Sequence, residues 1–466
     1  MAAKSRFQRK IDRREFLRLT ALAGAGIVAA SCVPPAAAPA PAAAPTQAPA
    51  AAVPTAAPQP TAAPAAAGKV PLRFVVMDYD DKMRADTKAL VDEFNASQDA
   101  IEVKLDVYSW ADGHETLLTQ ISGGQAPDLA NGNAQWVGEW NGINEVLPLD
   151  GLLSKEFLAN FVPSGIQAFT IDGKLAALPY FLDPRAIYYR KDLFEKAGLK
   201  APETWDDVFA AAQKLNNPPD INAFGAAFSR RSDDLDYWWY AWLGANGADG
   251  NTKLWDEKGK SRFNTPEGIA ATQFLVDLNQ KYKAMNPDFV TASRDGDVQP
   301  LFYAGKLAML ETGPWFPTLL KNNAPNLDVG ILPIPVSKAG MKPVTAFWPD
   351  AVMMFKQSKH PKEAAQFLEW IYSKQNRLLF AKQRGVIPER IDVGTDPAYA
   401  VSDTEKFFVE QVKTAKNAYE TPFPATIFKV FTEVENLIAR AVAGELTAAE
   451  AMKQAADYAD KTNGVK

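Results

Sequence analysis

From about residue 69 onward, the period of apolar residues switches repeatedly between two residues, as in a strand, and 3.6 residues, as in a helix. This alternation constrains the fold more than any other feature of the sequence. The segments VPLRFVVM (70–77) and IEVKLDV (101–107) have the period of strands. Between them, Val91 and Phe94 have helical spacing. Strands that alternate with helices in this way predict an α/β protein.

Helix starts can be read directly from three short patterns. TWDD (204–207) and TAAE (447–450) have the form of capping boxes, in which a threonine side chain accepts a hydrogen bond from the backbone three residues later. In HPKEAAQFLEWI (360–371), apolar residues recur at helical spacing after Pro361. We therefore predict a helix in each of these segments.

Residues 33–68 contain no charged residue and consist almost entirely of Ala, Pro, Thr and Gln. This composition favours an extended polyproline II chain over a packed fold, so we interpret residues 32–68 as a stalk. Fully extended at about 3.1 Å per residue, it would reach roughly 100 Å. The remaining part, about 400 residues, exceeds the usual size of a single core, so two lobes are expected.

The N-terminal residues 1–31 combine basic residues, a short apolar run and small residues directly before Cys32, the only cysteine of the chain. This arrangement is typical of an export signal, because the run is too short to span a bilayer comfortably. Arg13 and Arg14 resemble the twin-arginine signal, and AASC (29–32) resembles the lipobox of bacterial lipoproteins. We predict a signal peptide over 1–31 and lipidation of Cys32, with the twin-arginine and general export routes both open.

The charge of the chain argues against a nucleic-acid partner. The formal net charge is −5, and residues 1–31 carry seven basic and two acidic residues, so their removal would leave −10. An acidic chain without a basic block is a poor nucleic-acid binder. A chain with one cysteine also forms no intramolecular disulfide.

The sequence lacks the patterns of common catalytic and metal sites. Its two histidines, His114 and His360, do not have metal-ligand spacing, and it contains no Gly-rich phosphate loop, nucleophile elbow or HExxH motif. We therefore expect no metal, no cofactor and no Ser–His or Cys–His catalysis. A catalytic carboxylate pair stays open, because any of the 55 acidic residues could contribute to one.

Aromatic residues are concentrated in polar, turn-prone segments, where burial in a core explains them least well. These segments are NGNAQWVGEW (131–140), DYWWYAWLGANG (236–247), GPWF (313–316) and AFWPDA (346–351). Sugar rings have flat C–H faces and many hydroxyl groups, so a sugar site needs aromatic rings together with Asp, Asn and Arg. The pattern indicates a carbohydrate site, although a tryptophan taken singly is more often a core residue than a ligand contact.

Six segments, in order, resemble the extracellular solute-binding proteins of ABC importers, in particular the family 1 sugar-binding group. The resemblance extends from about residue 69 to the last residue of the sequence. The segments are LLTQISGGQAPDL (117–129), DGKLAALPY (172–180), IYYRKDLFEKAGLKAPETWDD (187–207), LFYAGKLAMLETGPW (301–315), FKQSKHPKEAAQFLEWI (355–371) and GVIPER (385–390). The resemblance implies a two-lobe α/β fold of the periplasmic-binding-protein type (type II), with a hinged ligand cleft.

In this family the chain crosses more than once between the lobes. The pattern places lobe one at residues 69–183 and 344–383, and lobe two at residues 184–343 and 384–466. The first crossing is expected near Pro184, which interrupts two strand-like runs. Open α/β sheets bind ligands beyond the carboxyl ends of their strands, which agrees with a cleft at this crossing.

The resemblance also implies which residues contact the solute. Trp315 and Trp348 match positions where the family commonly contacts its solute, so we expect their rings to stack on a sugar. Asp350, two residues beyond Trp348, is expected to bind hydroxyl groups. Further candidates are Tyr79, Asp80, Asn133, Trp136, Asp183, Trp242 and Arg384. Alanine at Trp315 or Trp348 is expected to weaken binding and leave the melting temperature of the solute-free protein nearly unchanged.

The predicted function is that of a monomeric, lipid-anchored protein at the outer face of the cytoplasmic membrane. It would capture a carbohydrate, in particular a di- or oligosaccharide, by cleft closure and deliver it to the transmembrane subunits of an ABC permease. A secreted glycoside hydrolase with a carboxylate pair and a tethered receptor for signalling are alternatives from other functional classes. Peptides, polyols and glycerol phosphodiesters stay open as solutes.

A Cys32→Ala chain expressed in its host should be released from membranes, because the acyl groups on Cys32 are the predicted anchor. Fractionation of cell extracts beside the unaltered chain measures this. A variant that stays with the membranes as the unaltered chain does would show that the anchor lies elsewhere.

Overall fold

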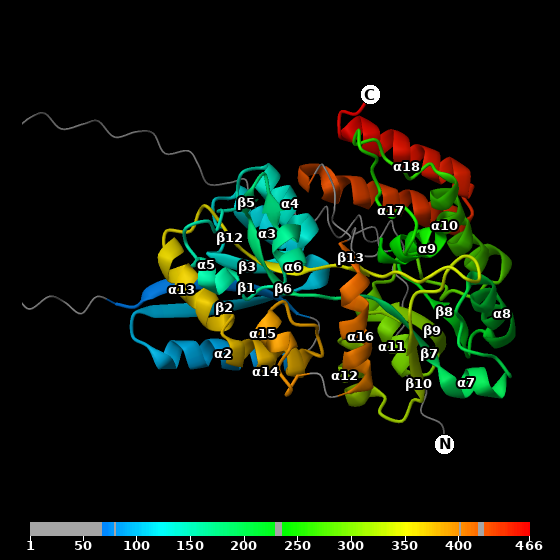
Figure 1. Cartoon of the computed structure of the whole chain (residues 1–466), viewed down its shortest axis with the longest axis horizontal. Helices are drawn as coiled ribbons and strands as arrows, with labels where there is room; N and C mark the ends of the chain where they lie inside the picture. Colours follow the sequence, from blue (N-terminus) through cyan, green and yellow to red (C-terminus); the bar gives the residue numbers. More distant parts are fainter. Residues whose placement is uncertain (1–67, 79–80, 229–234, 400–401, 418–423) are drawn as a thin grey trace, which may run out of the picture. The chain divides into compact units, whose positions relative to one another are not determined.

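The computed structural model describes residues 68–78, 81–228, 235–399, 402–417 and 424–466 (Figure 1). The predicted signal peptide, all but the last residue of the predicted stalk, and Cys32 lie outside the described residues, as do Tyr79 and Asp80. The strands belong to two main sheets, and the buried apolar side chains form two separate clusters, one around each sheet. We call each sheet with its cluster a lobe.

The first lobe contains a five-stranded sheet with the order β2-β1-β3-β12-β6. Its strands are β1 (Val70–Asp78), β2 (Ile101–Ser109), β3 (Leu129–Asn133), β6 (Ala177–Phe181) and β12 (Asp350–Met354). The strands predicted over 70–77 and 101–107 are thereby confirmed, and they pair in parallel with Val70 opposite Ile101. Strand β12 runs antiparallel to both β3 and β6.

Helices cover both faces of this sheet, which explains why β1 is buried continuously from Phe74 to Met77. Phe74 packs edge-on against Phe367 of α13, with ring centroids 5.5 Å apart. On the other face, Met77 lies directly against Gly113 of α3. The helices are α2 (Asp81–Ser97), α3 (Trp110–Ser122), α4 (Ala134–Gly142), α5 (Lys155–Leu158), α6 (Pro163–Ala168), α13 (Pro361–Ile371) and α14 (Lys374–Arg384), with a short hairpin β4 (Thr170–Ile171) and β5 (Lys174–Leu175).

The second lobe contains a four-stranded sheet with the order β10-β7-β9-β8. Its strands are β7 (Ala186–Arg190), β8 (Asn222–Gly225), β9 (Leu307–Thr312) and β10 (Val329–Leu332). The helices that follow these strands are α7 (Lys191–Lys196), α8 (Trp205–Leu215), α9 (Asp236–Asn246), α10 (Pro266–Val276), α11 (Gln299–Tyr303) and α12 (Phe316–Asn323), with the π-helical turns η1 (Asp277–Lys281) and η2 (Arg294–Val298). Strand β7 runs antiparallel to β9 and β10, and β8 runs parallel to β9.

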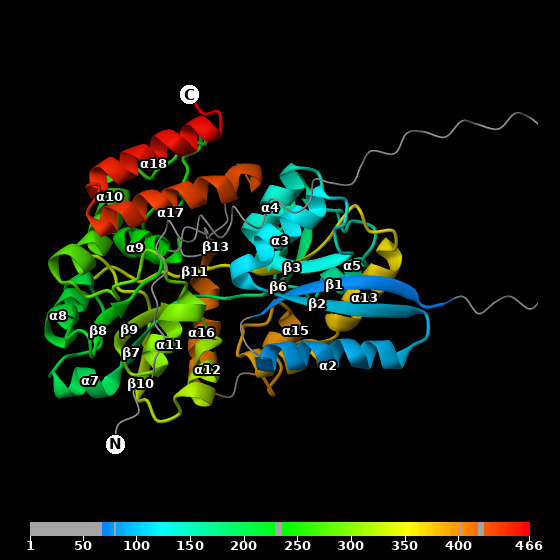
Figure 2. The same ribbon diagram turned by 180° about the vertical axis from the view of Figure 1, so that it is seen from behind.

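The C-terminal segment adds helices to this second core. Helices α17 (Ile427–Ala443) and α18 (Ala448–Thr462) lie beside α9 and α10 in both views of the chain (Figures 1 and 2). The remaining elements are α15 (Ile391–Gly394), α16 (Asp403–Thr414), η3 (Pro424–Thr426) and a two-stranded sheet of β11 (Ala346–Phe347) and β13 (Lys416–Asn417). The capping boxes predicted at Thr204 and Thr447 are confirmed, and Pro361 begins α13 as expected.

Three segments connect the lobes and are bonded to one another. The first joins β6 to β7, the second joins β10 to β12, and the third follows α14. The backbone N–H of Leu182 donates to the carbonyl of Ile387 over 2.9 Å, and Pro184 forms a β-bridge with Phe347. The lobe boundaries predicted at 183/184, 343/344 and 383/384 fall in or beside these segments and stay predictions.

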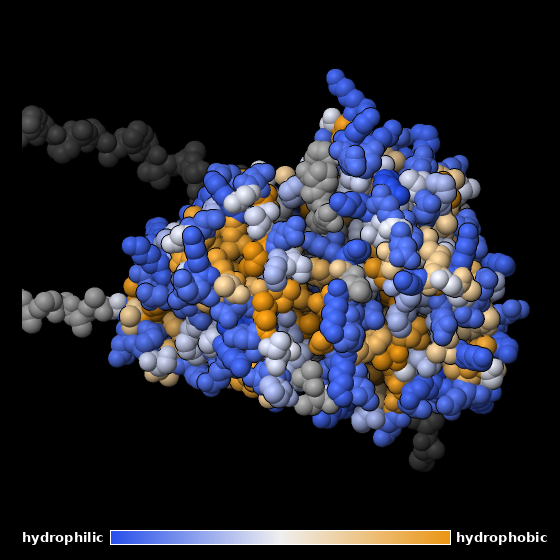
Figure 3. All heavy atoms as spheres, viewed as in Figure 1, coloured by the Kyte–Doolittle hydropathy of each residue, from blue (hydrophilic) through white to orange (hydrophobic). Residues whose placement is uncertain are grey.

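The surface of the described chain is largely polar. Figure 3 shows polar side chains around most of the rim of one face, with apolar side chains visible mainly toward its middle. The large apolar side chains that are clearly exposed are Ile143, Leu379 and Ile391. Within the described segments, no helix combines the length and the apolar character needed to cross a membrane.

The third connecting segment begins at Gly385, whose backbone is in the left-handed region with φ +70°. A Cβ atom added there would lie 2.7 Å from Oγ1 of Thr318 and 3.1 Å from the carbonyl oxygen of Pro314, at the start of α12. Glycine is therefore required at this position by the backbone conformation and by a close approach between segments.

We expect Gly385→Ala to destabilise the protein more than Gly198→Ala does. Gly198 also has a positive φ, +63°, but nothing lies within 4 Å of an added Cβ atom, so it is a matched control for the conformational cost alone. That cost is about 1–2 kcal/mol, and the collision at Gly385 should add about 1 kcal/mol or more. Urea unfolding of both variants measures the difference, and equal losses would show that the close approach is not tight.

Candidate functional site

The strand ends of the two lobes face each other across the first connecting segment. In the first sheet, β3 ends at Asn133, β6 ends at Phe181, and the antiparallel β12 begins at Asp350, paired with both. In the second sheet, Ala186 at the start of β7 pairs with Thr312 at the end of β9. Because only four residues separate Phe181 from Ala186, the two edges are held close together.

A pocket at the edge of the first sheet combines aromatic and polar side chains. Its lining residues are Val76, Met77, Met83, Trp110, Asn131, Tyr180, Phe181, Asp350, Phe380, Arg384 and Val386. Asp350 and Arg384 are both buried, with 8% and 5% of their surfaces exposed. Two of the residues that the family resemblance implies therefore lie in one pocket, beside the rings of Trp110 and Tyr180.

Arg384 also lines a neighbouring pocket between α2 and α12, together with Trp315. Its Nη2 atom donates to the carbonyl oxygen of Met83 over 2.9 Å and to Oγ1 of Thr87 over 2.8 Å. Its Nε and Nη1 atoms are buried and have no hydrogen-bond acceptor in the described protein. These N–H groups are donors still available to a ligand.

Trp315 lies at the start of α12, directly after β9 of the second lobe, but its side chain is buried in the apolar cluster of the first lobe. Its surface is 6% exposed, and the Arg185 guanidinium lies over its ring at 4.7 Å from the centroid. Gly313 is needed beneath the ring, because a Cβ atom at that position would collide with it. The GPW sequence thus places an indole ring across the space between the lobes.

Trp348 shows the reverse arrangement. Trp348 lies two residues before β12 of the first sheet. Its side chain nevertheless belongs to the apolar cluster of the second lobe, and its surface is 3% exposed. Its backbone N–H donates to Oδ1 of Asp183 over 2.8 Å, and its indole N–H donates to the hydroxyl of Tyr240 over 3.1 Å. The ring of Trp239 packs edge-on against it, with centroids 5.7 Å apart.

The burial of Trp315 and Trp348 corrects one expectation. Exposed stacking rings would tolerate alanine without loss of apo stability, but replacing a buried tryptophan leaves a cavity that costs about 3–5 kcal/mol. Alanine at either position is therefore expected to lower the melting temperature of the solute-free protein, and it cannot by itself distinguish a binding role from packing.

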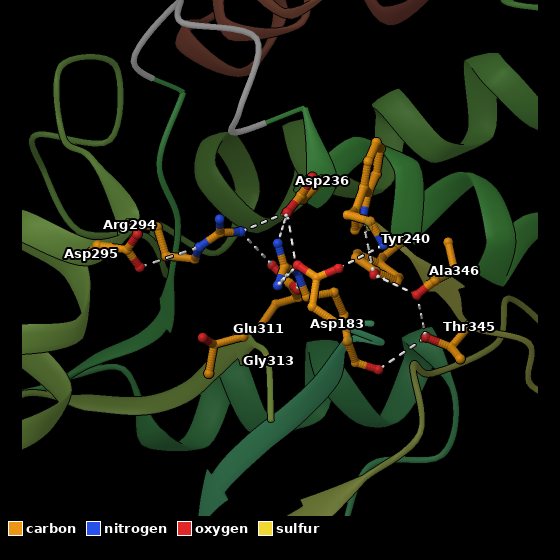
Figure 4. A network of polar contacts seen from close by, with 12 residues as sticks. Asp183, Asp236, Tyr240, Arg294, Asp295, Glu311, Gly313, Thr345 and Ala346 are labelled. Carbon is orange, nitrogen blue, oxygen red and sulfur yellow. Dashed lines mark hydrogen bonds and ion pairs between the residues drawn. The ribbon is translucent and has the colours of Figure 1, made fainter. Parts of the chain in front are cut away.

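A network of buried charges includes Asp183, Asp236, Arg294 and Glu311 (Figure 4). Arg185 pairs with Asp183 at 3.1 Å and with Asp236 at 2.7 Å, and Arg294 also pairs with Asp236 at 2.7 Å. Glu311 of β9 lies 3.5 Å from Arg185 and 3.8 Å from Arg294. Three almost completely buried carboxylates thus share two guanidinium groups.

The excess of acids affects Asp183 most clearly. Burial raises the pKa of Asp183 to about 7; the nearby Arg185 opposes this rise, and the charge of Asp236 adds to it. The hydrogen bond from the backbone of Trp348 also favours the ionised form. Neutral pH is therefore close to the pKa of the Asp183 carboxyl group, so both its protonated and its ionised forms are populated.

Three of the predicted site residues pack in a core or cap a helix. Trp136 and Trp242 are completely buried in the cores of the first and second lobes, and Trp242 donates to the carbonyl oxygen of Thr252 over 3.0 Å. Asn133 caps α4 by accepting the backbone N–H of Trp136 over 3.1 Å. The structure brings neither tryptophan to the pockets, whereas Asn133 lies beside Asp350 in the sheet.

Other residues at the site were not predicted from the sequence. They are Trp110, Tyr180, Arg185, Trp239, Tyr240 and Asp236. Trp110 follows the end of β2, so the rule that ligands bind beyond strand ends would have found it. Trp239 is on the same helix as Trp242, and no signal in the sequence shows which face of that helix turns toward the cleft.

In the segments described by the structure, no three or more histidine, cysteine, aspartate or glutamate residues are arranged to hold a metal ion.

The sequence matches known proteins over most of its length. A family model described as bacterial extracellular solute-binding protein matches residues 80–377. A binding protein of Brucella abortus is 32% identical over 332 residues, which cover 70% of this chain and 77% of the relative. A maltotriose-binding protein of Pyrococcus abyssi is 24% identical over 318 residues, covering 66% of this chain and 64% of the relative.

The fold also has close counterparts among solved structures. An ABC transporter solute-binding protein of Thermotoga lettingae, crystallised with α-D-tagatose, superposes with a TM-score of 0.76 over 84% of this chain and all of the other, at 23% identity. This likeness confirms the predicted two-lobe α/β architecture. The match to residues 80–377, which span more than half of the sequence, shows that the chain belongs to the bacterial extracellular solute-binding proteins.

Proposed function

We propose that this protein captures a carbohydrate, in particular a di- or oligosaccharide, between its lobes and delivers it to the permease of an ABC importer. The observation that carries the proposal is the pocket in which buried Asp350 and Arg384 lie beside Trp110 and Tyr180. A carboxylate accepts hydrogen bonds from hydroxyl groups, a guanidinium donates to them, and aromatic faces pack against the C–H faces of a sugar.

The unsatisfied donors of Arg384 support a neutral ligand rather than an anion. Both hydrogens of Nη2 are used by Met83 and Thr87, and Nη2 belongs to both edges of the guanidinium that can bind a carboxylate or phosphate with two parallel hydrogen bonds. The remaining N–H groups on Nε and Nη1 can therefore act only as separate donors. Separate donors suit the hydroxyl oxygens of a sugar.

The relatives are consistent with this proposal. One relative is named as a maltotriose-binding protein, and one structural neighbour holds the monosaccharide tagatose. Both names concern carbohydrates, and they support the solute class proposed for this chain.

A glycoside hydrolase is less well supported by the pocket. Hydrolysis would need two carboxyl groups on opposite sides of the glycosidic bond. Among the described residues that line the pocket of the first lobe, Asp350 is the only carboxylate. A receptor that signals would use the same closure. Deletion of the binding protein should abolish uptake of its solute if the protein serves transport, and should leave uptake unchanged if it serves signalling alone.

The proposal includes export and anchoring. Residues 1–31 would direct export, and acyl groups on Cys32 would hold the mature protein at the outer face of the cytoplasmic membrane, with residues 32–68 as a tether. A monomer suffices for this role, because one chain contributes both walls of the cleft.

The proposal predicts that a sugar binds and is released unchanged. Calorimetry and thermal shift against a panel that includes maltose, maltotriose, tagatose and mannitol should give at least one solute with micromolar or tighter affinity. Chromatography of the recovered sugar should show no product. Failure of every carbohydrate in a broad panel, or turnover that needs Asp350, would contradict the proposal.

Trp110→Ala should weaken binding of the sugar found in this way about ten-fold, because a lost aromatic face costs about 1.4 kcal/mol. Trp370→Ala is the matched control: both indoles are partly buried and pack against the first core, but Trp370 is on α13 and not among the lining residues of the pocket. Both variants should lose a similar, modest amount of stability. Equal affinities of the two variants would exclude Trp110 as a contact.

Asp183→Asn should change the pH dependence of stability. Because the pKa of Asp183 is about 7 in the folded protein, above the usual value of 3.8, its contribution is fully present at low pH and is lost as the pH rises through 7. The variant lacks this titration, so its unfolding free energy relative to wild type should rise by about 2 kcal/mol between pH 5.5 and pH 7.5. Urea unfolding at both pH values measures this, and a pH-independent difference would contradict the assignment.

A further inference from the structure

Arg185 lies in the first connecting segment, one residue before β7, and only 4% of its surface is exposed. Carboxylates surround the edges of its guanidinium group. Nε and Nη2 donate to Oδ2 of Asp236 over 3.1 and 2.7 Å, and Nη1 donates to Oδ2 of Asp183 over 3.1 Å. These contacts fix the plane of the group, because each involves a different N–H direction.

The flat face of the same group lies over the ring of Trp315, 4.7 Å from its centroid. The edges of the guanidinium are occupied by acids of the first connecting segment and of α9, so its face is held in one orientation against the indole. The Trp315 ring is confined further by the backbone of Gly313. The ring of Trp315 thus lies between the guanidinium group of Arg185 and its other packing neighbours.

Asp183 extends the same chain of contacts to the second tryptophan. One carboxylate oxygen accepts from Nη1 of Arg185, and the other accepts the backbone N–H of Trp348 over 2.8 Å. The carbonyl oxygen of Arg185 accepts from the hydroxyl of Thr345 over 3.0 Å, three residues before Trp348. Arg185 thus contacts one candidate stacking residue directly and holds the segment of the other.

We infer that Arg185 is a positioning residue of the solute site: its guanidinium group orients Trp315 and, through Asp183, the Trp348 segment for solute binding. This inference rests on the proposed carbohydrate function for its affinity measurement. It assigns Arg185 no contact with the solute; its effect on binding passes through Trp315 and Asp183.

Lysine at position 185 is the most informative substitution. It keeps one positive charge among the three carboxylates, but an ammonium group is compact and cannot lie flat on an indole while it also bonds two separate acids. Arg262→Lys is the matched control, because Arg262 lies 5.3 Å over the ring of Trp242, a core residue of the second lobe.

The test is a double-mutant cycle with Trp315→Phe, with maltotriose or the panel sugar of largest thermal shift as the probe. Arg185→Lys should weaken binding about ten-fold, and Arg262→Lys should stay within two-fold of wild type. Because Arg185 acts largely through Trp315, the double variant should bind no more than about two-fold more weakly than the weaker of the two single variants. Losses that multiply fully, or wild-type affinity for Arg185→Lys, would overturn the inference.

A second variant keeps the test decisive if Arg185→Lys does not fold. Asp236→Asn leaves Arg185 in place and weakens the contact that orients Nε and Nη2. It should reduce the affinity at least three-fold, and again non-additively with Trp315→Phe. An unchanged affinity would count against the inference.

Failure of the proposed function can be distinguished from failure of this inference. If no carbohydrate binds the wild-type protein, the solute-free protein still reports on Trp315 through the difference in fluorescence between each protein and its Trp315→Phe form. Arg185→Lys should shift that difference spectrum, and Arg262→Lys should leave it unchanged. No shift for Arg185→Lys would refute the positioning role whatever the solute is.

Discussion

Buried charges can exist where the two lobes are connected only because each has a partner, and the geometry of the cleft depends on this pairing. Arg377 and Glu389 pair at 2.7 Å, with Glu389 completely buried, and Arg377 also donates to the carbonyl oxygen of Tyr180. On the other side, Arg185 pairs with Asp183 and Asp236. An unpaired charge at such a position would be strongly destabilising, so these contacts fix the connecting segments as firmly as apolar packing fixes the cores.

The fold could be predicted well from the sequence because its signals are local. Apolar alternation defined β1 and β2, the capping boxes defined the starts of α8 and α18, and Pro361 defined the start of α13.

The candidate site could be predicted only in part. Asn133 lies at the carboxyl end of β3, as a topological rule anticipates, and Asp350 lies beside it only because β12 is antiparallel. Trp136 and Trp242 belong to the cores, because residue type alone does not separate a core tryptophan from one at a cleft. Arg185 could not be found, since two of its acidic partners, Asp236 and Glu311, are distant along the chain.

The exchanged burial of Trp315 and Trp348 has a consequence for binding. Each ring comes from a segment of one lobe and packs in the apolar cluster of the other. A motion of one lobe against the other therefore changes the surroundings of both rings at once. A solute that contacts them gains interactions in one arrangement that it lacks in another, and such a difference is what shifts an equilibrium between open and closed forms.

The connecting segments are also bonded to one another. Leu182 is bonded to Ile387, Pro184 bridges to Phe347, and Asp183 accepts from Trp348, so the three segments form one bonded unit. A change of backbone torsion in one segment alone would break its contacts to the other two segments. It would also separate buried ion pairs, which is strongly destabilising. Closure that preserves these bonds is a rotation of each lobe against the unit as a whole. If the lobes close on a solute as proposed, side chains held by the unit, Arg185 above all, would carry the same motion to both tryptophans.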